Sequence, residues 1–158
     1  MEERDYPARP WTGVGVIVWR GDQVLLIRRG KEPRKGQWSI PGGMQELGET
    51  AKAAGIREVM EETGIAIAID GLIDVVDLIL PDDAGRIRTH YTLIDYYGHC
   101  LEEDAEPRPG GDVDASRWVH HDRLKDYGLW PQTERVIDES RVLRQHGAVR
   151  GKFITGEQ

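Results

Sequence analysis

Residues 43–65 read GMQELGETAKAAGIREVMEETGI, and this stretch decides most of what the chain can be. A helix is predicted over residues 50–63, because Thr50 is a favoured N-cap residue and Gly64 suits the left-handed conformation that ends a helix. Gly55 lies inside this helix at a cost of about 1 kcal/mol relative to alanine, so we expect a neighbouring backbone to pack closely against it. The apolar side of the helix consists of Ala51, Ala54, Ile56, Val59 and Met60.

The last two turns of this helix carry three glutamates on one face. At 100° per residue, Glu58 and Glu62 lie about 40° apart around the helix axis, and Glu58 and Glu61 lie about 60° apart. Like charges at these spacings repel one another, and the C-terminal half of a helix disfavours anions. The local interactions therefore disfavour this clustering of glutamates. A locally unfavourable arrangement of this kind is typical of a functional site.

These glutamates have two interpretations at this point, a solvated acidic face or a site for a divalent cation. Carboxylate oxygens suit Mg²⁺ or Mn²⁺, which take a few carboxylates together with waters and substrate phosphates. The neighbouring residues favour the cation site. Arg57 precedes Glu61 by four residues and can hold it in place, and Glu49 adds a carboxylate at the start of the helix. Gly42 and Gly43 form a loop where the backbone can approach an ion or phosphate closely.

Outside this stretch the chain consists mainly of predicted strands. A second helix is expected over residues 131–145, with Pro131 at its first position and a loose, flexible tail over 148–158. Residues 101–114 are acidic, contain two prolines and two glycines, and are expected to form a long loop. The strands, recognised from alternating or short continuous apolar runs, are expected over residues 11–19, 24–27, 38–40, 65–69, 72–80, 87–97 and 117–119.

This order of elements predicts the fold class. The two helices are too far apart in the sequence for regular alternation with parallel strands, so the pattern favours an α+β sandwich with a mixed sheet. The chain has 158 residues and shows neither a repeat nor a linker. We therefore expect one domain over residues 1–158, with its core over about residues 10–146.

The composition limits the possible functions. Hydrophobic residues make up 39% of the chain and charged residues 31%, which argues against a membrane protein and against disorder. With 21 basic and 28 acidic residues the formal charge is −7, so we expect no nucleic-acid partner, although metal cations can still link the protein to phosphates. Cys100 is the single cysteine and excludes an internal disulfide. The charged N-terminus does not resemble a signal peptide, so a cytoplasmic location is expected.

Residues 43–65 resemble the Nudix box, Gly-x5-Glu-x7-Arg-Glu-U-x-Glu-Glu-x-Gly-U, in which U is an aliphatic residue. The order of the strands, the WSIPGG stretch before the box and the second helix extend the resemblance over roughly residues 10–146. The resemblance implies an α/β/α sandwich with a mixed sheet. The positions that match the box are Gly43, Glu49, Arg57, Glu58, Val59, Glu61, Glu62, Gly64 and Ile65.

The resemblance also implies an activity and a set of site residues. Nudix proteins are typically metal-dependent hydrolases of a nucleoside diphosphate linked to another group. Membership implies that Glu58, Glu61 and Glu62 are catalytic and ligate Mg²⁺ or Mn²⁺, together with the Gly43 carbonyl and with Glu49 as a ligand or a supporting group. Arg57 would orient the carboxylates through salt bridges.

The general base remains open between a glutamate of the box and a carboxylate from a later loop. Asp112, in the acidic loop six residues before Trp118, is the candidate for this extra carboxylate. The alternative is that Asp112 is a solvated loop residue. Asp114, Glu102 and Glu103 are weaker candidates.

Several residues near the glycine loop are candidates for substrate contacts. Arg29 leaves a predicted strand near this loop and can meet a phosphate, and Gly42 and Gly43 leave room for one. Trp38 and Tyr91 are candidates for stacking on a base, although aromatic residues in strands are more often part of the core.

The substrate is less well determined than the reaction. The segments HYTLIDYYGHC and DVDASRWV resemble a bacterial branch often described as ADP-ribose pyrophosphatases, and Pro81 lies 16 residues after Ile65, a spacing associated with ADP-ribose hydrolysis. ADP-ribose is therefore the preferred substrate, giving AMP and ribose 5-phosphate. The alternatives are a nucleoside triphosphate pyrophosphohydrolase that cleans the nucleotide pool and a non-catalytic nucleotide-sensing module. Relatives of this kind are often homodimers, which is the expectation here.

Overall fold

The computed structural model describes the backbone over residues 4–157 and side chains over residues 4–146. Its core is a mixed seven-stranded sheet with the order β3-β2-β1-β6-β5, in which β1 and β6 are parallel, while β4 pairs with β1 and β7 with β2. The elements are β1 (Trp11–Arg20), β2 (Gln23–Arg29), β3 (Trp38–Ser39), β4 (Gly42–Met44), α1 (Ala51–Thr63), β5 (Ile67–Pro81), β6 (Ile87–Cys100), β7 (Val113–His120), the 3-10 helix η1 (His121–Tyr127) and α2 (Pro131–Glu157).

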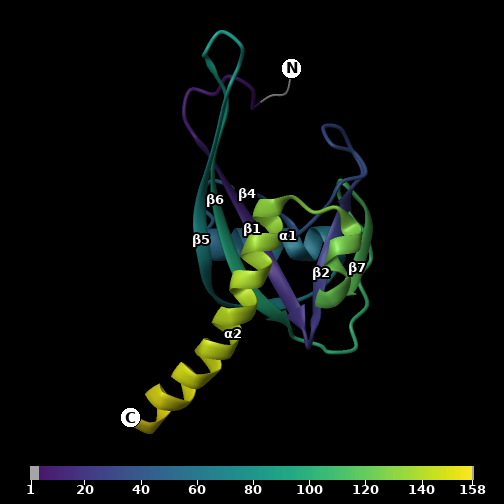
Figure 1. Cartoon of the computed structure of the whole chain (residues 1–158), viewed down its shortest axis with the longest axis vertical. Helices are drawn as coiled ribbons and strands as arrows, with labels where there is room; N and C mark the ends of the chain where they lie inside the picture. Colours follow the sequence, from purple (N-terminus) through teal and green to yellow (C-terminus); the bar gives the residue numbers. More distant parts are fainter. Residues whose placement is uncertain (1–3, 158) are drawn as a thin grey trace.

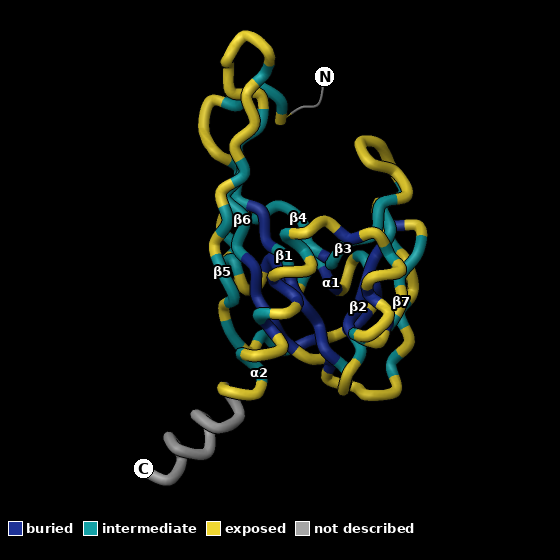
Figure 2. Tube along the Cα trace, viewed as in Figure 1, coloured by how far each residue is buried: buried dark blue, intermediate teal, exposed yellow. Residues whose placement is uncertain are grey.

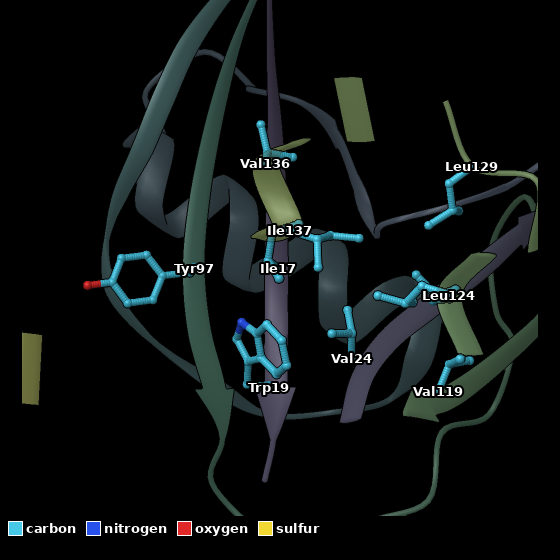
Figure 3. Close-up of a cluster of buried hydrophobic side chains, with 10 residues drawn as sticks. Ile17, Trp19, Val24, Tyr97, Val119, Leu124, Leu129, Val136 and Ile137 are labelled. Atoms are coloured by element: carbon cyan, nitrogen blue, oxygen red, sulfur yellow. The ribbon is translucent and has the colours of Figure 1, made fainter. Parts of the chain in front are cut away.

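The two long helices cover opposite faces of this sheet (Figure 1). Successive side chains of a strand point to opposite faces, and the apolar side chains of β1 are buried on both. Val16 and Val18 pack with Val59 of α1, in a cluster that also contains the buried Cys100. On the other face, Ile17 and Trp19 pack with residues of α2 (Figure 3). The structure thus confirms the predicted α/β/α sandwich.

The helix α1 agrees with its prediction to within one residue. The Thr50 side chain accepts a hydrogen bond from the Ala53 N–H, and Gly64 ends the helix in the left-handed conformation with φ 72°. Gly55 faces β1 at close range, since a Cβ atom there would lie 2.8 Å from Cγ2 of Val16. The close approach expected at Gly55 is therefore real, but it is made to side chains of β1 and not to a backbone.

Five elements differ from the predictions. The strand β7, expected over residues 117–119, begins at Val113 inside the segment expected to be a loop, because it pairs with β2 along its whole length. The strands expected over 65–69 and 72–80 form one strand, β5. Its pairing with β6 continues across the expected break because the register shifts between Ile69 and Gly71 and between Leu72 and Asp74. Residues 42–44 pair with β1, although Pro41 and two glycines predicted a stop. The helix η1 was not predicted. The helix α2 continues to Glu157 where it was expected to end at residue 145, so the tail expected to be loose is helical up to that point.

The β5–β6 hairpin extends beyond the sandwich and is exposed at its tip (Figure 2). The N-terminal segment packs against this tip: the Tyr6 hydroxyl donates to Asp82 at 2.9 Å, and the Tyr6 N–H donates to the Arg88 carbonyl at 2.8 Å. These contacts fix the approach of the chain into β1. Within the described part of the chain, none of the helices is both long and apolar enough to cross a membrane.

The packing at Gly55 gives a test of the fold. Gly55→Ala adds a methyl group where Val16 leaves no room, so we expect a loss of about 1–3 kcal/mol in the free energy of unfolding despite the better helix propensity of alanine. Urea denaturation measures this change. Lys52→Ala, on the exposed side of α1, is the control and should change stability little. A Gly55→Ala variant more stable than the wild type would contradict the packing.

Candidate active site

Arg57 lies at the centre of a carboxylate network on α1. Its Nε and Nη2 donate to the two carboxylate oxygens of Glu49 at 2.7 and 3.0 Å. Its Nη1 donates to Glu58 at 2.9 Å and to Glu61 at 3.3 Å, and Nη2 also donates to the Met44 carbonyl at 3.0 Å. One planar guanidinium therefore holds three glutamates and a backbone oxygen, a task that the single ammonium group of lysine could not perform.

The short strand β4 brings backbone against the same glutamates. The Gly42 N–H donates to Oε1 of Glu62 at 2.8 Å. A Cβ atom on Gly43 would collide with the Glu58 carboxylate, so only a glycine lets β4 come this close to α1. The pairing of β4 with β1 over residues 13–15 fixes it in this position. The glycines thus place the backbone of β4 beside the carboxylates.

The glutamates differ in their electrostatic surroundings. The hydrogen bonds from Arg57 lower the pKa of Glu49. Glu58 also binds Arg57, but its burial outweighs this contact and raises its pKa. Burial raises the pKa of Glu62 to about 7, and the charge of Glu58 adds to the effect. The nearby positive charges thus do not offset the burial of Glu58 and Glu62, and a bound cation would supply more positive charge at this place.

The acidic loop after β6 docks against the C-terminus of α1. The Arg108 N–H donates to the Thr63 carbonyl at 2.8 Å, and the Gly110 N–H donates to the Glu62 carbonyl at 3.1 Å. A helix end leaves such carbonyls without intrahelical partners, so the loop satisfies them. The loop then delivers Asp112, whose carboxylate binds Lys31 at 2.7 Å. This contact lowers the pKa of Asp112.

A cavity of about 370 Å³ lies beside the glutamates and is lined in part by Glu62 and Asp112. It lies where the partner of β1 changes, because β1 pairs with β4 over residues 13–15 but with β2 at Trp19 and Arg20. The strands β1 and β2 diverge above this point (Figure 1). Gly13 and Gly15 of β1 also line the cavity, and their missing side chains leave room for Leu93 and Asp95 of β6, each 2.8 Å from where a Cβ atom would lie.

The structure brings most of the expected substrate contacts to this cavity. Arg29, Trp38, Gly42 and Gly43 line it. Tyr91 lies elsewhere, near the start of the shared register of β1 and β6, where it pairs with Trp11. Sequence reasoning missed three other lining residues, Asp95, Trp130 and Gln132. Pro131 indicated the start of a helix, but no sequence signal showed that its first turn would face a cavity.

The donor set of this site fits a hard divalent cation. Glu58, Glu61 and Glu62 offer carboxylate oxygens, and burial raises the pKa of Glu58 and Glu62 despite the positive charges nearby. In the conformation described, Glu58 and Glu61 bind Arg57, whereas Glu62 accepts from the Gly42 N–H. Over the residues with described side chains, one group of three His, Asp or Glu residues has its ligand atoms within 4.8 Å of one another, and it lies at the junction of β7 and η1: His120, His121 and Asp122.

Comparison with known proteins identifies the family. The NUDIX domain model matches residues 9–140, which include the acidic helix and the cavity. The chain belongs to the Nudix family. Nudix hydrolases generally use divalent metal, in agreement with the donor set described above. The chain is accordingly a pyrophosphohydrolase that acts on nucleotide substrates.

The relatives of this Nudix protein carry different substrate names. An ADP-ribose pyrophosphatase from Methanocaldococcus jannaschii is 29% identical over 126 residues, covering 77% of this chain and 75% of the relative. A putative 8-oxo-dGTP diphosphatase 2 from Mycobacterium tuberculosis is 35% identical over 140 residues, covering 85% of this chain and 90% of the relative. The crystal structure of a MutT Nudix hydrolase from Burkholderia pseudomallei has a TM-score of 0.68 and 30% identity, covering 83% of this chain and 98% of that one.

The raised pKa of Glu62 predicts a pH-dependent stability of the metal-free protein. The folded-state pKa of about 7 exceeds the ordinary value of 4.5, so the folded state binds this proton more tightly than the unfolded state. Stability from this group is present below about pH 4.5 and is lost as the pH rises through 7, by about 3 kcal/mol in total.

Glu62→Gln tests this effect, because glutamine keeps an acceptor for the Gly42 N–H and does not ionise. In EDTA, we expect the variant and the wild type to have similar unfolding free energies at pH 4.5 and the variant to be more stable at pH 8. Urea denaturation across this range measures the difference. A difference that does not change with pH would contradict the assignment, and added Mg²⁺ should reduce the difference at pH 8.

Proposed function

We propose that this protein hydrolyses the pyrophosphate bond of a nucleoside diphosphate linked to another group, with ADP-ribose as the preferred substrate and Mg²⁺ or Mn²⁺ as the metal. The observation that carries the proposal is the set of four glutamates at α1: Arg57 holds Glu49, Glu58 and Glu61, and the fourth, Glu62, lines the adjacent cavity of about 370 Å³. The relative described as an ADP-ribose pyrophosphatase and the position of Pro81 support ADP-ribose.

In this proposal the carboxylates of Glu58, Glu61 and Glu62 and the carbonyl of Gly43 hold the metal. A bound divalent cation neutralises the phosphates and lowers the pKa of a coordinated water, which supplies a nucleophile at neutral pH. Glu49 does not need to contact the metal, because its two oxygens are occupied by Arg57. Arg57 is then a positioning residue that keeps Glu58 and Glu61 oriented.

The remaining residues of the cavity mouth bind the diphosphate and move a proton. Arg29 lines the cavity and places a positive charge near Glu62, where a phosphate would approach. Glu62 and Asp112 both line the cavity, and either carboxylate is a candidate to accept the proton of the attacking water. Since Glu62 serves as a metal ligand in this proposal, Asp112 is assigned as the base.

A second candidate function keeps the reaction and changes the substrate. The relative described as a putative 8-oxo-dGTP diphosphatase is 35% identical to this chain, which favours a nucleoside triphosphate as the alternative substrate. The products distinguish the two functions. ADP-ribose gives AMP and ribose 5-phosphate, whereas a triphosphate gives a nucleoside monophosphate and pyrophosphate.

The test of the function is a panel of nucleoside diphosphate compounds and triphosphates incubated with Mg²⁺ or Mn²⁺, with the products resolved by chromatography. We expect AMP and ribose 5-phosphate from ADP-ribose at a higher kcat/KM than for any triphosphate. Glu58→Gln should abolish turnover with Mg²⁺ while leaving the circular dichroism spectrum unchanged. Near-normal activity of this variant would remove the metal-site assignment, and release of pyrophosphate from triphosphates alone would favour the second function.

The assignment of Asp112 as the base has its own test. Asp112→Asn should lower kcat by about 100-fold or more, in the range that a lost general base typically costs, with little change in KM. Asp114→Asn is the matched control, because Asp114 is a carboxylate two residues away that binds Arg28 at 2.6 Å. An Asp112→Asn variant that keeps the kcat of the wild type, as Asp114→Asn should, would contradict the assignment and leave Asp112 as a solvated loop residue.

A further inference from the structure

A group of metal-ligating side chains lies outside the active site, at the junction of β7 and η1. This histidine cluster consists of His120, the last residue of β7, and of His121 and Asp122, the first residues of η1. Successive side chains of a strand point to opposite faces. Because the chain changes from strand to helix between the two histidines, their rings instead lie side by side, with centroids 4.6 Å apart and planes inclined by 30°. Two imidazoles and a carboxylate therefore meet at one place.

The spacing of the ligand atoms in the histidine cluster is close to that of a coordination shell. Oδ1 of Asp122 lies 2.9 Å from Nδ1 of His121, and Oδ2 of Asp122 lies 3.7 Å from Nδ1 of His120. Bonds of about 2.0–2.1 Å from zinc to nitrogen or oxygen place two ligands of a tetrahedral site about 3.3 Å apart. The two separations lie on either side of this value, so small side-chain rotations are enough to enclose an ion.

The hydrogen bonding of His120 leaves two acceptor atoms facing each other. The Asp122 N–H donates to Nδ1 of His120 at 3.2 Å, so this nitrogen carries a lone pair and the hydrogen of the neutral ring is on Nε2. The carboxylate of Asp122 is also an acceptor and has no hydrogen to offer. A cation between the nitrogen lone pair and the carboxylate oxygen would bind both.

The surrounding structure holds the two histidines in place and leaves one side of the histidine cluster open. His120 pairs in register with Gln23 of β2, and the His121 N–H donates to the Asp22 carbonyl at 3.0 Å. The side chain of His121 is only 18% exposed. An open surface pocket lined in part by His120 leaves room for water ligands. Ligands that are already positioned need little rearrangement to bind a metal.

The register of the sheet separates the histidine cluster from the glutamates of the active site. Gly15 pairs with Gly42 at the end of β1 that lines the cavity. The stretch of β1 from Gly15 to Arg20 spans about 16 Å, at about 3.3 Å per residue. Arg20 pairs with Gln23, which in turn pairs with His120. The histidine cluster therefore lies beyond the far end of β1 and is a separate place on the molecule.

We propose that His120, His121 and Asp122 bind a divalent cation of the zinc class, at a site separate from the active site. Imidazole nitrogens suit Zn²⁺, Ni²⁺ and Cu²⁺, whereas Mg²⁺ prefers oxygen ligands, so the two sites select different ions. A ring nitrogen of each histidine and one oxygen of Asp122 bind the ion, and water completes its coordination. The bound ion links the end of β7 to the start of η1. This inference does not depend on the proposed substrate.

Calorimetry with Zn²⁺ in excess Mg²⁺ tests the affinity of the site, since Mg²⁺ competes for the glutamates of α1. We expect the wild type to bind Zn²⁺, and His121→Ala and Asp122→Asn each to lower the affinity at least about 10-fold, because a lost ligand costs at least as much as a lost supporting residue. His99→Ala is the matched control. His99 also binds a carboxylate, Asp70, at 2.8 Å, but this pair has no second imidazole, so the affinity should stay unchanged.

Anomalous scattering at the zinc absorption edge locates the ion directly. In crystals soaked with Zn²⁺ and Mg²⁺, we expect a peak about 2.0–2.1 Å from a ring nitrogen of His120 and of His121. His120→Ala replaces His121→Ala if the circular dichroism spectrum shows that the half-buried position does not tolerate alanine. A zinc peak at the glutamates of α1 alone, or a zinc affinity equal in the wild type and the cluster variants, would overturn the proposal.

Discussion

The binding of Arg57 to Glu49, Glu58 and Glu61 is the interaction on which the rest of the site depends. Carboxylates at this spacing repel one another, and they lie near the helix end where the dipole disfavours them. A guanidinium can satisfy several of them at once because its donors point in fixed directions in one plane. Its further bond to the Met44 carbonyl ties α1 to β4, so the same residue that gathers the acids also sets the distance between helix and sheet.

Glu62 is held in a different way from the other acids. It has no contact with Arg57 among the described interactions, and a backbone N–H from Gly42 is its hydrogen-bond partner. Its carbonyl is bound by the loop that carries Asp112. The end of α1, the strand β4 and the acidic loop thus converge on one residue. This convergence explains why a carboxylate there is more buried and more easily protonated than its neighbours on the same helix.

Local sequence signals predicted the elements that local interactions determine. Thr50 and Gly64 marked α1 because an N-cap and a left-handed C-terminal residue act within a few positions. The end of α2 was expected at residue 145, two residues before Gly147, but the helix continues because a glycine inside a helix costs only about 1 kcal/mol. The strand β5 was divided at Gly71, whereas pairing with β6 carries it through with a shift in register.

The residues of the site likewise fall into those that the local sequence predicted and those that only the tertiary structure shows. The box glutamates were predictable because their spacing on one helix already brings them together. Asp95 was not, since a polar residue in a strand is ordinarily expected to face solvent, and only the pairing of β6 with β1 turns it over Gly15. Tyr91 was expected near the substrate by residue type alone, and its place in the sheet register puts it beside Trp11 instead.

The two faces of β1 serve different properties of the protein. The face with Gly13 and Gly15 shapes the room for a ligand, and the other face supports the catalytic helix. The opposite face of β1 is occupied by valines that pack on α1, so the catalytic helix is supported independently of whatever fills the hollow. Side chains added at Gly13 or Gly15 would displace Leu93 or Asp95 and change the room for a ligand, while the valines on the other face keep their contacts with α1. One face of β1 can therefore change in evolution with the ligand that is bound, while its other face continues to support the catalytic helix.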